Sequence, residues 1–185
     1  MTDPYTLPAN LPVPEDDGAA DHLAGRELPS VVLDSSRGPV DVAELGADLG
    51  VLYVYPRTGV PGRPLPPGWD RIPGARGCTP QSCGFRDRAA ELAAFDARVA
   101  GVSSQTLAEQ VEFAERNRMP FPVLADPQLL LRDALGLPTF ETSGMTLYRR
   151  LALVVRAGRI EKVFYPVFPP DRNAADVVAY LRSRG

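Results

Sequence analysis

CTPQSCGFRD, from Cys78 to Asp87, is the stretch around which the rest of this 185-residue chain is organised. It holds the only two cysteines, Cys78 and Cys83, and its apolar residues begin a helical spacing that continues to about residue 94. The segments before it predict a strand and a long loop that deliver Cys78. The segments after it predict the scaffold that holds Cys78 in place.

A thiol at the start of a helix meets unpaired backbone N–H groups and the positive end of the helix dipole, and both favour the thiolate. A thiolate attacks a peroxide oxygen to give a sulfenic acid, which a second thiol can convert to a disulfide. Cys83 is the only second thiol in the chain. Positions five apart on an ideal helix have Cα atoms roughly 8–9 Å apart, whereas a disulfide needs about 7 Å or less. We therefore expect residues 78–83 to unwind when the two sulfurs bond.

Other interpretations of two cysteines have to be weighed against this one. Free cysteine packs well as a small apolar residue, so both could be structural. A zinc site needs more ligands than two sulfurs and a distant histidine, and His22, the only histidine, is expected to be a solvated tail residue. A thioredoxin-type exchange site has Cys-x-x-Cys, whereas the spacing here is Cys-x4-Cys. We expect no metal and no cofactor.

The composition indicates one domain, residues 28–185, after a flexible or draped tail, residues 1–27. A net charge of −3 gives no reason to expect a nucleic-acid or anionic-membrane partner. The apolar runs are far shorter than the roughly 20 residues that span a bilayer. The N-terminus has acids and prolines where a signal peptide would have basic and then apolar residues. We therefore expect a cytoplasmic protein, as a monomer or weak homodimer.

The order of elements predicts an α/β fold with a mixed central sheet flanked by helices. An N-terminal β-hairpin is followed by a buried central strand, and a two-residue turn joins the last two strands. Thr106 and Glu109 form a capping-box pattern, and Leu107, Val111 and Ala114 form the apolar stripe of that helix. Pro122 weakens its strand or places it at an edge. The predicted strands are 31–33, 40–42, 49–55, 98–103, 121–124, 150–155 and 159–164, and the helices are 79–94, 106–118, 127–135 and 171 or 173 to about 182, with one short turn at 43–45.

The loop 57–77 separates the central strand from Cys78. It is rich in proline and glycine, and its four arginines against one aspartate give it a net charge of +3. Trp69 indicates an ordered loop, because a large aromatic gains most by packing. The loop is either a rigid lid or wall, or a polyproline ligand for a partner domain through Pro64 to Pro67.

The segment Cys78 to Asp87 resembles the active-site segment of the peroxiredoxins, most closely the peroxiredoxin Q (bacterioferritin comigratory protein) branch, where Cys-Thr-x-x-x-Cys-x-Phe-Arg-Asp is usual. Val54-Tyr55-Pro56 and the strand from Arg150 also look like family segments. The resemblance implies a thioredoxin-like fold, with Cys78 as peroxidatic cysteine and Cys83 as resolving cysteine in the same chain. Arg150 would hold the thiolate and polarise the peroxide. Strand alternation puts Arg149 and Arg150 on opposite faces, so only one of them can point to the site.

One departure from the family matters. The usual pattern is Pro-x-x-x-Thr-x-x-Cys, but Ala75 stands three residues before Cys78 and Arg71 seven before it. Either Thr58, the nearest hydroxyl to Pro56, folds back into the site, or the hydrogen bond that the family's threonine gives to the peroxide comes from elsewhere.

The resulting expectation is a thiol peroxidase that reduces hydrogen peroxide or organic hydroperoxides and is reduced by thioredoxin, glutaredoxin or a small thiol. Two alternatives remain open. One is a peroxide-responsive redox switch that acts through a partner, and the other is a thioredoxin-fold binding module with structural cysteines.

Overall fold

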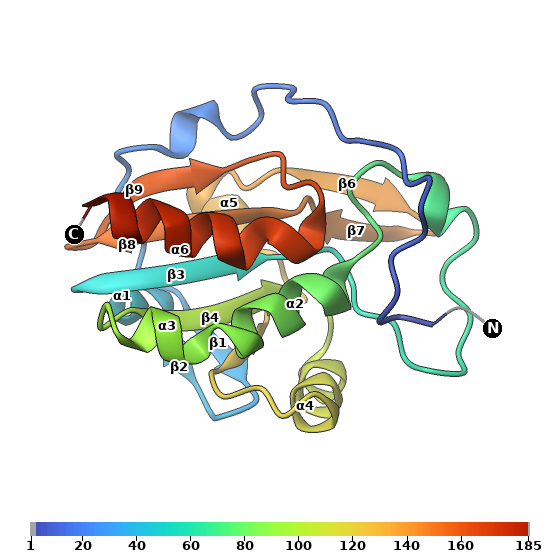
Figure 1. Ribbon diagram of the computed structural model, residues 1–185, viewed down its shortest axis with the longest axis horizontal. Helices are drawn as coiled ribbons and strands as arrows, with labels where there is room; N and C mark the ends of the chain where they lie inside the picture. The colour runs from blue at the N-terminus through green and yellow to red at the C-terminus, as the bar shows by residue number, and fades with distance from the viewer. Residues whose placement is uncertain (1–2, 185) are drawn as a thin grey trace.

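The computed structural model describes residues 3–184. A seven-stranded mixed sheet has the order β2-β1-β5-β4-β3-β8-β9, and a separate hairpin pairs β6 with β7 (Figure 1). The strands are β1 Val32–Ser35, β2 Val40–Asp41, β3 Leu49–Val54, β4 Arg98–Ser103, β5 Val123–Ala125, β6 Thr139–Thr142, β7 Met145–Tyr148, β8 Leu151–Arg156 and β9 Arg159–Phe164. The helices are α1 Val42–Leu45, α2 Cys78–Asp87, α3 Ala89–Ala93, α4 Leu107–Arg116, α5 Leu130–Leu135 and α6 Asn173–Arg184, with 3-10 turns η1 Asp21–Leu23, η2 Trp69–Arg71 and η3 Pro170–Arg172.

The strand β3 lies at the centre of the sheet, and all six of its residues are buried. It pairs in parallel with β4 and antiparallel with β8. Leu52 and Val54 belong to the apolar core on one face, whereas Val51 and Tyr53 belong to the core on the other. Helices α2 and α6 cross in front of the sheet and α5 lies behind it (Figure 1). This confirms the prediction of a mixed sheet flanked by helices.

Helix α2 is fastened to the sheet by an aromatic stack. The rings of Tyr53 and Phe85 are 4.4 Å apart at 10°, and both side chains are fully buried. A Cβ atom at Gly101 would lie 2.5 Å from the Tyr53 ring, so glycine there makes room for the stack. The stack fixes the C-terminal half of α2 over β3.

Turn and cap signals in the sequence are confirmed. β1 and β2 form the expected hairpin. Ala157 and Gly158 join β8 to β9 with φ of +49° and +75°, the left-handed conformation that a two-residue hairpin requires. Thr106 and Glu109 make the capping box of α4.

Four local predictions are wrong. The predicted helix 79–94 is two helices, because the backbone leaves the helical region at Arg88. Of the predicted apolar stripe of α4 only Ala114 is buried; the buried face also holds Gln110 and Phe113, and Gln110 donates inward to Leu124 O. β5 starts after Pro122, so it lacks the first two residues of the predicted strand 121–124, and it lies between β1 and β4, not at an edge.

The fourth concerns the helix predicted at 127–135. Leu129 is left-handed with φ of +58°, so the helix starts only at Leu130, whose N–H donates to the Asp126 carboxylate at 2.8 Å. The hairpin β6–β7 was not predicted. Its turn is Ser143-Gly144, both with positive φ.

The N-terminal segment lies along the domain. It starts beside the N-terminal end of α2 and runs over the β9 side of the sheet before β1 (Figure 1). Leu23 of η1 is fully buried, and the exposed His22 has Nε2 2.9 Å from Leu135 O. Within residues 3–184, none of the helices combines the length and apolarity needed to cross a bilayer.

Candidate active site

Cys78 is the first residue of α2, and its side chain is almost completely buried, with 3% of its surface exposed. The preceding Gly77 has φ of +103°, a region that favours glycine. A Cβ atom at Gly77 would lie 2.3 Å from Pro170 Cγ and 2.9 Å from Leu7 Cδ2, so only glycine fits. The loop therefore turns sharply at Gly77 and places the thiol where the helix begins.

Arg150 lies directly against this thiol. Its Nη2 is 3.2 Å from Cys78 Sγ, and Arg150 is only 3% exposed. A guanidinium donor at this distance stabilises a thiolate and any negative charge that develops on a reacting oxygen. The structure thus brings Cys78 and Arg150 together.

The guanidinium of Arg150 is held in place by backbone carbonyl groups. It donates to the carbonyl oxygens of Gly74, Ala75 and Arg76 at 3.0–3.3 Å. It also donates to Gln81 Oε1, and Gln81 in turn donates to Asn173 Oδ1 at 2.9 Å. These contacts clamp the turn before Cys78 and the first turn of α2 around one cation.

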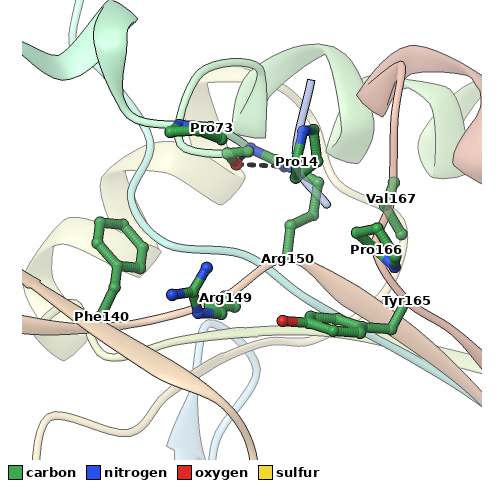
Figure 2. Close-up of a pocket in the computed structure, with 9 residues that line it drawn as sticks. Pro14, Pro73, Phe140, Arg149, Arg150, Tyr165, Pro166 and Val167 are labelled. Carbon is green, nitrogen blue, oxygen red and sulfur yellow. Dashed lines mark hydrogen bonds between the residues drawn. The ribbon is translucent and has the colours of Figure 1, made fainter. Parts of the chain in front are cut away.

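Arg149 and Arg150 leave the chain in different directions (Figure 2). Arg150 extends toward Pro73 and the Gly74 carbonyl, whereas Arg149 lies on the side of Phe140 and Tyr165. Arg149 is half-buried, and among residues 3–184 its side chain makes no hydrogen bond. The pair therefore offers a matched comparison of two neighbouring cations, one at the thiol and one away from it.

Cys83 lies further along α2 and away from Cys78. Both cysteines are free thiols, and Cys83 Sγ is 3.8 Å from Asn117 Oδ1. Burial raises the pKa of the Cys83 thiol, an effect that Arg86 and Arg116 partly offset. Because residues 78–83 are all helical here, the two sulfurs cannot bond without a change in α2.

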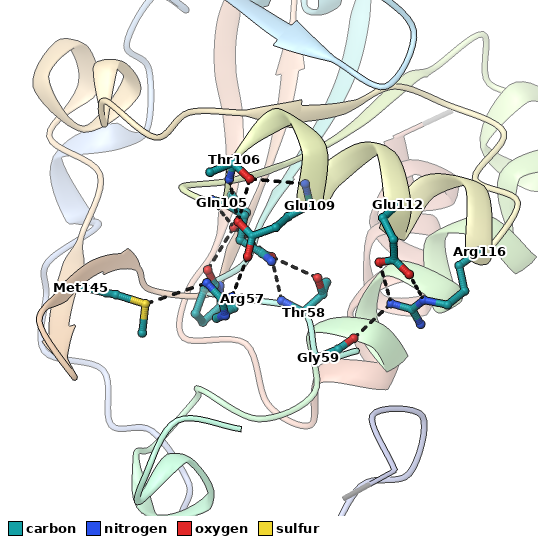
Figure 3. Close-up of polar contacts among 11 residues, drawn as sticks. Arg57, Thr58, Gly59, Gln105, Thr106, Glu109, Glu112, Arg116 and Met145 are labelled. Atoms are coloured by element: carbon teal, nitrogen blue, oxygen red, sulfur yellow. Dashed lines mark hydrogen bonds and ion pairs between the residues drawn. The ribbon is translucent and has the colours of Figure 1, made fainter. Parts of the chain in front are cut away.

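Thr58 is occupied elsewhere. It is buried, and both its N–H and its Oγ1 bond to Gln105 Oε1, at 2.8 and 3.0 Å (Figure 3). Within the part of the chain that the structure describes, Thr58 neither bonds to Cys78 nor lines the pocket over it. The structure does not bring Thr58 together with Cys78 and Arg150.

The sequence did not single out Thr79, which follows Cys78 directly. Its hydroxyl is buried and has no hydrogen-bond partner among residues 3–184. Buried hydroxyls are nearly always satisfied, so one without a partner calls for an explanation. Thr79 lines a small pocket with the thiol; the pocket residues are Pro4, Arg57, Gly59, Leu65, Trp69, Arg76, Gly77, Cys78 and Thr79.

The loop 57–77 forms most of the wall of this pocket. Trp69 is buried with 3% exposed, and it packs in a cluster with Ala75 and Leu147. Arg57 pairs with Glu109 at 2.6 Å (Figure 3). Arg76, also missed from the sequence, is 6% exposed and pairs with Asp70 at 3.3 Å. Two cations, Arg57 and Arg76, thus border the thiol pocket, while Arg150 contacts the sulfur itself.

Comparison with known proteins identifies relatives over most of the chain. The Redoxin family model matches residues 23–181. The chain is 24% identical over 160 residues to the chloroplastic peroxiredoxin Q of Arabidopsis thaliana, covering 86% of this chain and 67% of that protein. It is 29% identical over 137 residues to peroxiredoxin bcp1 of Schizosaccharomyces pombe, covering 72% of this chain and 63% of that protein.

Among solved structures, the peroxidoxin BcpB of Mycobacterium tuberculosis is similar with a TM-score of 0.70 and 27% identity, covering 86% of this chain and 96% of that one. A PrxQ mutant of Xylella fastidiosa has the same TM-score at 18% identity, covering 87% and 96%, and so shares the fold. The thioredoxin-like fold expected from the sequence is confirmed.

Proposed function

This chain belongs to the Redoxin family and is a peroxiredoxin, a thiol-dependent peroxidase. We propose that it reduces hydroperoxides through Cys78 and then forms a Cys78–Cys83 disulfide. The observation that carries the proposal is the 3.2 Å contact between Arg150 Nη2 and Cys78 Sγ at the start of α2. A guanidinium donor at hydrogen-bond distance from a sulfur stabilises the thiolate, which is the form that attacks a peroxide.

The first step is a displacement at oxygen. The Cys78 thiolate attacks the terminal oxygen of the hydroperoxide, the S–O bond forms, and the O–O bond breaks. The leaving alkoxide or hydroxide takes a proton from water, and Cys78 is left as sulfenic acid. Arg150 stabilises the negative charge on the leaving oxygen. We assign the hydroxyl contact with the bound peroxide to Thr79 rather than Thr58, because Gln105 already occupies Thr58.

The second step joins the two sulfurs. The Cys83 thiolate attacks the Cys78 sulfur, the S–S bond forms, and hydroxide leaves and is protonated to water. A dithiol reductant such as thioredoxin or glutaredoxin then returns both cysteines to thiols and is itself oxidised. The need for such a reductant fits a reducing compartment such as the cytoplasm.

Helix α2 has the properties of a segment that unwinds readily. Its N-cap, Gly77, makes no side-chain cap bond, and the first turn holds no acidic residue. Gly84 lies inside the helix, where glycine costs about 1 kcal/mol relative to alanine. The hydroxyls of Thr79 and Ser82 are buried without a partner within residues 3–184. Helix α4 differs in both respects, because its N-cap Thr106 makes a side-chain cap bond and its first turn holds the acidic residue Glu109.

The test is a peroxidase assay of the wild type, Cys78→Ser and Cys83→Ser with thioredoxin, glutaredoxin and dithiothreitol as separate reductants. We expect Cys78→Ser to abolish peroxide consumption with every reductant. We expect Cys83→Ser to consume one equivalent and to stop turning over with the protein reductants. Full activity in Cys78→Ser would contradict the proposal. Oxidation of the wild type without turnover under any reductant would favour a redox switch instead.

A further inference from the structure

The N-terminal residues 3–14, here called the strap, lie across the pocket of Cys78. Pro4 is buried and lines that pocket together with the thiol. The side chain of Leu7 covers Gly77, since its Cδ2 would be 2.9 Å from a Cβ atom there. The strap thus supplies the part of the pocket wall that the loop 57–77 leaves open.

Arg76 fastens the strap at this position. Its Nη2 donates to the backbone carbonyl oxygens of Asp3 at 2.6 Å and Thr6 at 3.3 Å, one on each side of Pro4. Arg76 is 6% exposed, so these bonds are largely shielded from water and bonds to a cation are strong there. The side chain that borders the thiol pocket is therefore the one that holds the strap over it.

Tyr5 and Pro14 make two further contacts between the strap and the domain. The hydroxyl of Tyr5 accepts a bond from Arg116 Nη1 at 2.8 Å, and Arg116 also donates to Gly59 O at 3.1 Å. Pro14 lies over Gly74 and next to Arg150 (Figure 2). The strap therefore contacts the loop, α4 and the turn that holds Arg150.

From these contacts we infer that the strap is a size filter, which admits hydrogen peroxide to Cys78 and disfavours bulky organic hydroperoxides; the inference rests on the proposed function of Cys78. Only 3% of Cys78 is exposed, and the same pocket is lined by Leu65 and the buried Trp69. A bulky substituent on the peroxide would meet Pro4 in this pocket. The strap precedes residues 23–181, the part of the chain that the Redoxin model matches.

The experiment uses the full-length protein with Pro4→Gly and Leu7→Ala combined, which removes the strap side chains that line the pocket and cover Gly77 but keeps both carbonyls that Arg76 binds. Pro8→Ala is the matched control, because Pro8 is exposed and does not line the pocket. The reduced proteins are mixed with hydrogen peroxide, tert-butyl hydroperoxide or cumene hydroperoxide. Acid-quenched mass spectrometry then follows the first oxidation of Cys78. Thermal unfolding confirms that the variants are folded, and Pro4→Ala alone serves if the double variant is not.

We expect the ratio of the cumene hydroperoxide rate to the hydrogen peroxide rate to rise by about tenfold or more in the double variant, the scale on which a pocket discriminates by size. Pro8→Ala should leave the ratio unchanged. An unchanged ratio in the double variant, or an equal fall of both rates, would overturn the size filter. So would a wild type that reacts equally fast with both peroxides. A wild type in which no peroxide oxidises Cys78 would instead defeat the proposed function itself.

Discussion

Replacing Arg150 with methionine tests the contact on which the catalytic proposal depends. Methionine keeps an unbranched chain of similar length but removes the charge and every donor. In the structure Arg150 Nη2 is 3.2 Å from Cys78 Sγ, so Arg150→Met leaves a buried sulfur without its cation. We expect slower oxidation of Cys78 by peroxide and slower alkylation by iodoacetamide at pH 7, because both reactions use the thiolate.

The expected magnitude follows from the bond that is lost. One hydrogen bond to a charged group is worth about 1.5–3 kcal/mol. Since each 1.36 kcal/mol is a tenfold change in rate, the oxidation rate should fall by about 10- to 150-fold. Stability should fall as well, because the buried Arg76 carbonyl and the buried Oε1 of Gln81 lose their donor. At about 1–3 kcal/mol for each unsatisfied group, the free energy of unfolding should fall by about 2–6 kcal/mol.

The assay is a single-turnover mixing experiment with hydrogen peroxide. Trp69 is the only tryptophan and borders the same pocket as Cys78, so its fluorescence can report the oxidation. Arg149→Met is the matched control. It removes the same charge at the neighbouring position, from a side chain that lies toward Phe140 and Tyr165 and not at the thiol. Urea unfolding of both variants separates lost chemistry from lost structure.

Comparable oxidation rates in Arg150→Met and the wild type would refute the role of Arg150. Equal losses in Arg150→Met and Arg149→Met would also refute it, because the effect would then come from net charge rather than from a specific contact.

Three further results are expected. Thr79→Val should slow oxidation of Cys78 by about 10- to 100-fold, whereas Thr79→Ser should stay near the wild-type rate. Alkylation by iodoacetamide should be unchanged in both variants. A normal rate of peroxide reaction in Thr79→Val would show that the hydroxyl has no role in the site. Asn117→Leu should leave the first oxidation of Cys78 unchanged and alter only disulfide formation, as measured by quenched mass spectrometry, because Asn117 contacts Cys83 alone of the two thiols. Disulfide formation should accelerate as pH rises through 8 to 9. Burial raises the pKa of Cys83 in the helix, so the helical form is favoured below the ordinary thiol pKa of about 8.5 and loses this advantage as the pH rises above it. A rate of disulfide formation that does not depend on pH would contradict this.

The sequence predicted the fold well where local chemistry agrees with the tertiary structure. The apolar run of β3, the capping box of Thr106 and the turn at Ala157-Gly158 each depend on a few neighbouring residues, and each is confirmed. The errors arose where contacts between residues far apart in the sequence determine which face of a helix is buried or where a helix begins. The face that α4 buries depends on the bond of Gln110 to β5, and the start of α5 depends on Asp126.

The same distinction applies to the site. The position of Cys78 at a helix start can be read from its neighbours. Arg149 and Arg150 do point in different directions, although both lie in the link between β7 and β8 and not in a strand as predicted. The occupation of Thr58 by Gln105 cannot be read in this way, since the two residues are 47 positions apart. The hydrogen bond from Arg76 to the Asp3 carbonyl likewise joins residues 73 positions apart. Long-range polar contacts of this kind have no periodic signature in a sequence.

The stack of Phe85 on Tyr53 has a consequence for the oxidised enzyme. A ring buried against the central strand resists displacement far more than the glycine and hydroxyl residues that precede it. Melting of α2 should therefore begin at Gly77 and end before Phe85, so that the disulfide forms within a short frayed stretch. Amide hydrogen exchange in the disulfide form should then speed up over residues 78–84 and stay slow from Phe85 onward, with the remainder of the molecule acting as a rigid frame through each catalytic cycle.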